Sequence, residues 1–202
     1  MSALNKVWEK IENVAEADGG IIRTSQVEKA GVSRPVIGKY VRDGKLERVR
    51  KGIYIISQGD HDEFALIQAQ HSQAVFSFGT ALFLWGMSDR TPHFIDVTFP
   101  QGVNASVIRR DNPDLRCHYV QARLYGIGIA EKRSPQGAMV RLYDRERCIC
   151  DLVRGKNILD AQLYSQALKE YFKSRPDIGK LIAYSRSFGI EAKIRTYLEV
   201  ML

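Results

Sequence analysis

The chain has 202 residues, 45% of them apolar, which suffices for one large domain or two small ones and excludes a disordered or fibrous protein. Its three cysteines lack CxxC spacing, so we expect no disulfide framework and a reducing compartment. No apolar run approaches a membrane span and no signal-type apolar core follows the start, so the sequence predicts a soluble, cytoplasmic protein that does not enter a membrane.

The formal net charge of +7 is distributed unevenly along the chain. Residues 1–57 hold 11 basic and 7 acidic side chains (+4), residues 58–109 hold 2 and 5 (−3), and residues 110–202 hold 17 and 11 (+6). A basic cluster on one compact motif is the usual electrostatic feature of a nucleic-acid-binding protein. The charge pattern therefore directs attention to the two ends of the chain.

The first 58 residues predict a winged helix-turn-helix domain. Apolar spacing predicts a helix over residues 4–17, and a short extended piece follows. Thr24 is a suitable N-cap for a brief second helix and Ser33 for a third, after which a two-stranded hairpin turns at Gly52. The predicted core residues are Leu4, Val7, Trp8, Ile11, Ile37, Tyr40, Val41, Leu46 and Ile55.

The third helix has an apolar side and a basic side. Its apolar residues recur at i, i+3 and i+4, which leaves a row of Arg34, Gly38 and Arg42 on the other side. A glycine in mid-helix costs about 1 kcal/mol relative to alanine, so Gly38 indicates that a partner approaches this side closely. The first residues of such a helix contact base edges in the major groove. The predicted base-contacting residues are Ser33, Arg34, Pro35 and Lys39.

The hairpin "GKLERVRKGIYII", residues 44–56, places positive charge at its tip. A hairpin after a recognition helix lies against the DNA backbone, where cations pair with phosphates. A solvated hairpin on an unrelated helical domain is the alternative, but the complete order of elements favours the wing. The full predicted DNA-binding set is Ser33, Arg34, Pro35, Lys39, Arg42, Lys45, Arg48, Arg50 and Lys51.

Residues 59–202 predict a second domain that is α/β in its first half and helical in its second. Helices are expected over 61–73 and between Ser77 and Gly86, and strands over 94–99, 116–121 and 138–143. Four helices follow, after Asp144, Asp160, Asp177 and Gly189. The predicted fold class is therefore α+β.

Three stretches together carry a resemblance to a known family: "DGKLERVRKGIYII", "FSFGTALFLWGMSDRTPHFIDVTFPQG" and "VRLYDRERCICDLVR". The chain resembles AbiE-type abortive-infection antitoxins, the antitoxin half of type IV toxin–antitoxin operons. The resemblance implies an N-terminal DNA-binding domain that represses its own operon at inverted repeats. It also implies a C-terminal domain that counters a nucleotidyltransferase-type toxin, and a protein that is not an enzyme. We expect a monomer when free and two or more copies on the operator.

The C-terminal helices predict a second basic surface. Their apolar residues are expected to pack in a core, which leaves the basic residues largely outside. This surface would contact DNA flanking the operator or the toxin. Its predicted members are Arg145, Arg147, Arg154, Lys156, Lys169, Lys173, Arg175 and Lys180.

Other chemistry fits the sequence less well, so we expect no catalytic residue, no metal and no cofactor. The stretch from Tyr125 to Gly128 resembles a dinucleotide fingerprint, but Glu131 takes the place of the third glycine. A nuclease motif at Pro113-Asp114 and Glu131 lacks the required lysine. The cysteines fit small buried residues better than a zinc site. The remaining alternatives are a DNA-targeted nuclease and a transcriptional regulator with a ligand-sensing C-terminal domain.

Overall fold

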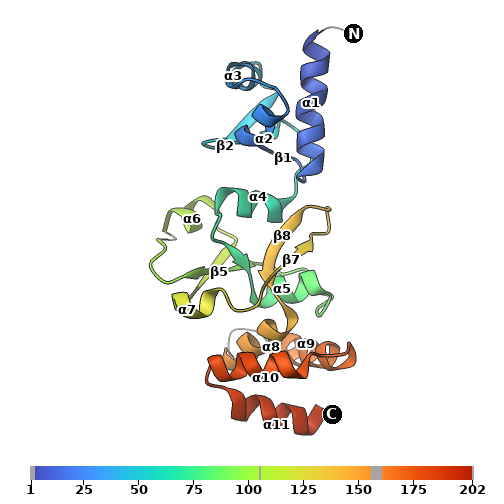
Figure 1. Cartoon of the computed structure of the whole chain (residues 1–202), viewed down its shortest axis with the longest axis vertical. Helices are drawn as coiled ribbons and strands as arrows, with labels where there is room; N and C mark the ends of the chain where they lie inside the picture. Colours follow the sequence, from blue (N-terminus) through green and yellow to red (C-terminus); the bar gives the residue numbers. More distant parts are fainter. Residues whose placement is uncertain (1–2, 105, 156–160, 202) are drawn as a thin grey trace. The chain divides into compact units, whose positions relative to one another are not determined.

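The computed structural model describes residues 3–104, 106–155 and 161–201. It confirms the α+β class, with two sheets and helices throughout the chain (Figure 1). The chain divides into two compact units. The N-terminal unit comprises Met1–Ser72 with Lys132–Val140, and the C-terminal unit comprises Gln73–Glu131 with Arg141–Leu202. Each is described by itself.

The N-terminal unit follows the predicted order of elements: α1 (Ala3–Ala17), β1 (Ile21–Arg23), α2 (Thr24–Lys29), α3 (Arg34–Arg42), β2 (Leu46–Arg50), β3 (Ile53–Ile56) and α4 (Glu63–Gln70). The N-cap of α2 is Arg23 rather than the predicted Thr24, whose hydroxyl instead donates to the Gly52 carbonyl at 3.4 Å. The helix predicted over 61–73 is shorter because Asp62 caps it, accepting from the Ala65 amide at 3.1 Å.

The three strands of this unit form an antiparallel sheet in the order β1-β3-β2. Its first face joins a core built with the helices from Ile11, Ala15, Ile22, Val27, Val32, Ile37, Tyr40 and Leu46. The second face carries Ile21, Ile53 and Ile55, which are also buried, and α4 packs against β1. The predicted core is thus confirmed for Ile11, Ile37, Tyr40, Leu46 and Ile55, whereas the side chain of Leu4 lies outside the described residues.

The β2–β3 hairpin contains an irregularity that the apolar pattern requires. Leu46 and Val49 are three residues apart, so a regular strand would point them to opposite faces. The register shifts between Arg48, opposite Tyr54, and Arg50, opposite Ile53, which leaves Val49 as an extra residue. The bulge lets Val49 turn partly inward while Arg48 and Arg50 both stay exposed.

The C-terminal unit begins with a mixed sheet. Its elements are β4 (Val75–Phe76), α5 (Phe78–Trp85), β5 (Ile95–Pro100), α6 (Ser106–Asp111), β6 (Leu115–Val120) and α7 (Ala122–Tyr125), followed by β7 (Ile129–Arg133) and β8 (Met139–Tyr143), each of which crosses a unit boundary. The strand order is β6-β5-β4-β8-β7, with β5 antiparallel to β4 and parallel to β6. The predicted strands over 94–99, 116–121 and 138–143 correspond to β5, β6 and β8.

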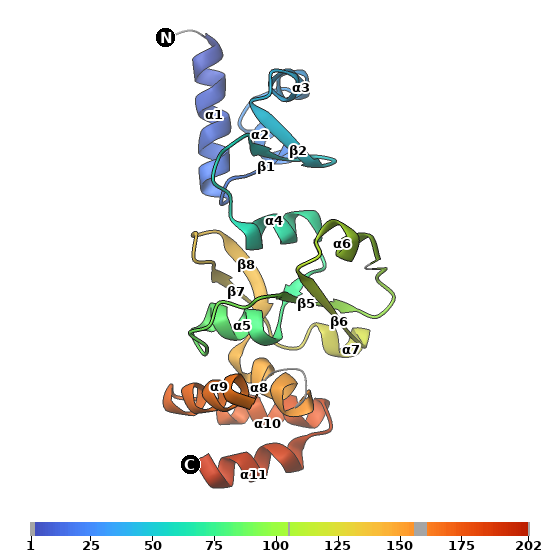
Figure 2. The ribbon, with the colours of Figure 1, turned by 180° about the vertical axis from the view of Figure 1, so that it is seen from behind.

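Four helices complete this unit: α8 (Arg145–Arg154), α9 (Ala161–Lys173), α10 (Ile178–Ser187) and α11 (Glu191–Met201). Figure 2 shows them packed together below the sheet, as drawn. The carboxylates of Asp144 and Asp177 cap α8 and α10, as predicted, whereas Asp160 lies outside the described residues. Across the ranges that the structure describes, no helix is both long and apolar enough to cross a membrane.

Helix α8 is the centre of this helical layer. It packs against α5, α9, α10 and α11. Every residue from Glu146 to Val153 is buried as a result, charged residues included. Arg145 and Arg154, at its two ends, are the charged residues of this helix that keep solvent exposure.

Candidate nucleic-acid interface

Helix α3 presents one side to the core and the other to solvent. It begins at the N-cap Ser33, tolerates Pro35 in its first turn, and ends at Asp43. Ile37 and Tyr40 are buried at 2% and 4% exposure, which fixes the rotation of the helix. The side predicted to meet DNA therefore faces outward.

The predicted DNA-binding residues all have exposed side chains. This holds for Ser33, Arg34, Pro35, Lys39, Arg42, Lys45, Arg48, Arg50 and Lys51. Among the described residues, no ion pair or hydrogen bond engages the side chains of Lys39, Arg42, Arg48 and Lys51. Four cations on α3 and the hairpin are thus available to an anionic partner.

Arg34 is held in place by a carboxylate of the preceding helix. Its Nε donates to Glu28 Oε1 at 2.6 Å and its Nη2 donates to Glu28 Oε2 at 3.3 Å. This hydrogen-bonded pair raises the pKa of Arg34 above its ordinary value. The side chain remains 74% exposed, so the fork is oriented by Glu28 without being covered.

Two of the predicted cations are committed to contacts within the unit. Lys45 Nζ lies 5.2 Å from the centre of the Trp8 ring and 5.7 Å from that of Tyr40, in cation–π contact with both. Arg50 donates to the carbonyl of Gln70 at the end of α4. Binding of DNA by either side chain would have to compete with these contacts.

Gly38 has no packing reason to be glycine. A Cβ added there would meet only the guanidinium of Arg42, at 3.6 Å, which is ordinary contact. The unfavourable helix propensity of Gly38 is therefore not compensated within the described protein. A close approach by an external partner remains the physical reason that we favour.

The structure removes Arg147 from the predicted second basic surface and engages two further members, Arg145 and Lys180, in contacts within the C-terminal unit. Arg147 is 1% exposed, and Arg145 caps the end of α9 by donating to the carbonyls of Tyr171 and Ser174 at 3.3 Å. Lys180 pairs with Asp144 at 2.9 Å. The remaining members differ: Arg154 and Lys173 pair with Asp151 and Glu170, Lys169 and Arg175 are exposed, and Lys156 lies outside the described residues.

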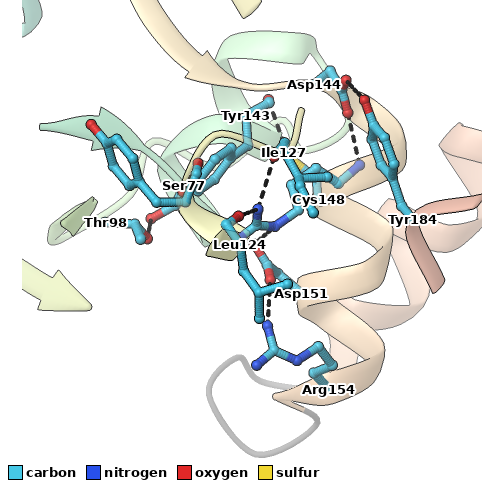
Figure 3. A network of polar contacts seen from close by, with 12 residues as sticks. Ser77, Thr98, Leu124, Ile127, Tyr143, Asp144, Cys148, Asp151, Arg154 and Tyr184 are labelled. Atoms are coloured by element: carbon cyan, nitrogen blue, oxygen red, sulfur yellow. Dashed lines mark hydrogen bonds and ion pairs between the residues drawn. The ribbon is translucent and has the colours of Figure 1, made fainter. Parts of the chain in front are cut away.

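Arg147 organises the interior of the C-terminal unit. Its Nε donates to Asp151 Oδ2 at 2.9 Å, and its Nη1 donates to the carbonyls of Leu124 and Ile127, both at 2.8 Å. Its guanidinium also lies 3.9 Å from the centre of the Tyr143 ring. Figure 3 shows the labelled Leu124, Ile127, Tyr143 and Asp151 converging on this point.

A glycine makes the approach to Arg147 possible. Gly128 has φ +79°, and a Cβ there would lie 2.7 Å from the Cβ of Arg147. The stretch from Tyr125 to Gly128, which resembled part of a nucleotide fingerprint, therefore brings the Ile127 carbonyl onto a buried guanidinium, beside the carbonyl of the preceding Leu124. Sequence reasoning missed this role because it depends on a contact between segments some twenty residues apart.

The buried carboxylate and thiols of α8 have shifted protonation equilibria. Burial raises the pKa of Asp151, although the guanidinium groups of Arg147 and Arg154 act to lower it. Burial also raises the pKa of the Cys148 thiol well above its ordinary value, and that of Cys150 to about 12. Both cysteines are buried small side chains, as the sequence predicted.

The comparisons with known proteins agree with the exposed basic side of the N-terminal unit. Residues 9–57 match a family model of transcriptional regulators. That family is described as "Transcriptional regulator, AbiEi antitoxin", and the match confirms the predicted resemblance to an AbiE-type antitoxin over this part of the chain.

The whole-chain fold has a solved relative. The crystal structure of the RV2827C protein from Mycobacterium tuberculosis aligns with a TM-score of 0.57 and 13% identity, over 90% of this chain and 71% of that one. At this identity the likeness concerns the fold alone. No curated protein matches the chain.

Proposed function

We propose that this protein is the antitoxin of a two-gene, type IV toxin–antitoxin system, and that it represses its own promoter. The observation that supports this proposal most directly is the set of exposed cations on α3 and the β2–β3 hairpin. These cations lie within the segment that matches an antitoxin and transcriptional regulator family. Its role is binding and regulation rather than catalysis. Abortive phage infection is the setting that the family resemblance implies.

In this proposal α3 enters the major groove of the operator. Ser33, Arg34, Pro35 and Lys39 lie in its first turns and are exposed, as base-contacting residues must be. Glu28 orients the Arg34 fork, and a planar fork suits the paired acceptors of a guanine edge. Arg48 and Lys51 on the hairpin contact phosphates, which adds affinity without sequence preference.

Two copies would bind an inverted repeat, one on each half-site, as symmetric operators require. Neutralisation of a nucleotidyltransferase-type toxin is assigned to the second domain, which we propose to span residues 59–202. The first domain is proposed to span residues 1–58. The compact N-terminal unit continues past residue 58, since α4 packs against β1. Tests of the proposal therefore use the full chain.

The test is a mobility-shift titration of the promoter fragment at several salt concentrations. Arg48→Ala and Lys51→Ala should each lower the slope of log affinity against log salt by about one counterion, because each removes one phosphate contact. Lys193→Ala and Arg195→Ala are matched controls with exposed cations of α11, and they should leave the slope unchanged. Equal slopes for all four variants would show that the hairpin does not contact DNA phosphates.

A second assay addresses the antitoxin role. The full chain is co-expressed with the product of the neighbouring toxin gene under an unrelated promoter, and growth is followed. Arg48→Ala and Lys51→Ala should rescue growth as well as the unchanged protein while repressing the native promoter less. Loss of rescue together with loss of repression would contradict separate sites for the two activities.

A further inference from the structure

A pocket lies in the C-terminal unit, between the sheet and α8. It has a volume of about 240 Å³, and its lining includes Phe78, Thr98, His118, Tyr119, Arg147 and Arg154. We call it the arginine pocket. Three of its lining residues, Thr98 of β5 and Asp151 and Arg154 of α8, are labelled in Figure 3.

Buried polar groups lie on the walls of the arginine pocket and directly behind them, where Asp96 and Ser77 pair with the lining residues His118 and Thr98. Asp96 is 3% exposed and accepts from His118 Nε2 at 2.7 Å. The buried hydroxyls of Thr98 and Ser77 are 2.8 Å apart, and the Arg147–Asp151 ion pair adjoins them on the pocket wall. A buried ion pair is weak evidence for stability, because desolvation offsets its attraction. Clusters of this kind in a cleft are typical of functional sites.

The backbone of one residue that lines the arginine pocket is strained. Phe78 has φ +44°, a conformation that costs a bulky residue about 1–3 kcal/mol. Its ring centre lies 4.2 Å from that of His118, so the strained residue braces the wall of the arginine pocket. Strain that is retained against a pocket wall is a further indication of a ligand site.

The arginine pocket opens into a wider groove of about 560 Å³. Tyr119, Val120 and Arg154 line both, and the groove adds Arg123 and Arg186. The two linings together contain four arginines and one carboxylate, Asp151. Asp151 pairs with Arg147 and Arg154, and Glu191 from outside the lining pairs with Arg186, but the arginines still outnumber these carboxylates, so the two cavities favour an anion.

We propose that the arginine pocket and its groove bind the phosphate group of a small phosphorylated ligand, with Arg154 as the central contact. Arg154 lies where the two cavities meet. Its side chain is 37% exposed, and its contact with Asp151 is a long one of 3.3 Å, so its other donors can face a ligand. A guanidinium fork matches the oxygens of a phosphate in a bidentate arrangement.

The other residues of the site have complementary roles. Nη2 of Arg147 has no acceptor among the described residues, whereas Nε and Nη1 of the same side chain are bonded. Arg123 donates to Gln121 at 3.0 Å and can approach the phosphate from the groove. Tyr119 is 42% exposed and offers a ring face to a planar group attached to the phosphate. This site is independent of the DNA-binding proposal, since all of its residues belong to the C-terminal unit.

The experiment is calorimetric titration of the full chain with inorganic phosphate, ribose 5-phosphate and AMP at low salt. Arg154→Gln should weaken binding at least about tenfold, as expected for loss of a hydrogen bond between charged groups. Arg123→Gln should weaken it less, and it provides a second measurement should Arg154→Gln fold poorly. Lys169→Gln, an exposed cation of the same unit, is the matched control and should bind like the unchanged protein.

The three ligands distinguish the sources of the phosphate. Tighter binding of AMP than of the other two supports a nucleotide that uses the Tyr119 ring, and equal binding of all three supports inorganic phosphate as the ligand. Absence of saturable binding to the unchanged protein would overturn the proposal. Equal affinities of Arg154→Gln, Arg123→Gln and Lys169→Gln would overturn it as well. Loss of binding in Arg48→Ala would instead place the phosphate on the hairpin and contradict the site.

Discussion

The two units use positive charge in opposite ways. The N-terminal segment of residues 1–57 and the C-terminal segment of residues 110–202 have formal charges of +4 and +6. In the first, Lys39, Arg42, Arg48 and Lys51 project from α3 and the hairpin without a described partner. In the second, three of the eight cations predicted to form a surface instead make internal contacts: Arg145 caps α9, Arg147 is buried, and Lys180 pairs with Asp144.

The difference teaches that a count of charges does not locate an interface. A cation serves a partner when its element has a solvent side that packing has left open, as α3 has. It serves the fold when packing encloses it, as Arg147 is enclosed on α8, whereas Arg154 at the exposed end of the same helix stays accessible. The following predictions test this contrast, beginning with the largest effect.

The largest effect should come from breaking the buried pair of α8. Asp151→Ala leaves Arg147 buried without its carboxylate, and removal of one partner of a buried pair costs about 3–5 kcal/mol. The measurement is urea unfolding followed by circular dichroism. Glu170→Ala, which breaks an exposed pair with Lys173, is the control and should cost less than about 1 kcal/mol. Similar losses in the two variants would mean that Arg147 is not the internal brace described above.

The glycines that precede β7 should respond very differently to the same substitution. Gly128→Ala forces a Cβ to within 2.7 Å of the Arg147 Cβ at φ +79°, and strain with overpacking should cost at least about 2 kcal/mol. Gly126→Ala meets nothing within 4 Å and has an ordinary helical φ of −73°, so it should be neutral or slightly stabilising. Thermal unfolding of both variants gives the comparison. A tolerated Gly128→Ala would refute the proposed close approach to Arg147.

These contrasts also show which features could be predicted from the sequence. The order of elements in the N-terminal unit followed from apolar spacing and turn residues, because α1 and α3 are amphipathic and bounded by local signals. The exposed side of α3 followed in the same way, since Ile37 and Tyr40 fix its rotation. Its role in DNA binding stays a prediction.

Other features depend on contacts that local patterns do not encode. The short strand β4 has only two residues, and β7 shows weak alternation, so neither was predicted. The burial of α8 depends on four neighbouring helices, and the charged residues of its own sequence give no sign of it. The His118–Asp96 pair joins two strands across the sheet and has no spacing signal.

The base-reading role of Arg34 should appear as specificity. Arg34→Ala should reduce the preference for operator over random DNA by about tenfold or more, because a bidentate base contact is lost. Arg195→Ala on α11 is the matched control, since this arginine also donates to a glutamate of its own unit, Glu191, at 2.7 Å. Competition mobility shifts measure the preference of each variant for operator over random DNA. Undiminished preference in Arg34→Ala would remove this residue from the readout.

The smallest effect concerns Gly38, and here stability and binding should move in opposite directions. Alanine in mid-helix is favoured over glycine by about 1 kcal/mol, and the site has room, because the nearest atom to an added Cβ is 3.6 Å away. Gly38→Ala should therefore stabilise the N-terminal unit by up to about 1 kcal/mol. If a DNA backbone or base edge approaches this point closely, the added methyl group keeps it away and operator affinity falls.

Gly179→Ala is the corresponding change on α10, where an added Cβ would also meet only one atom, Asp177 Oδ1, at 3.6 Å. It should raise stability without altering affinity for DNA, because the proposed interface lies on α3 and the hairpin. Unfolding curves and mobility shifts on both variants separate the two quantities. If Gly38→Ala stabilises the protein and leaves operator affinity unchanged, DNA does not approach α3 closely at residue 38. The outward side of α3 would then contact its partner elsewhere along the helix.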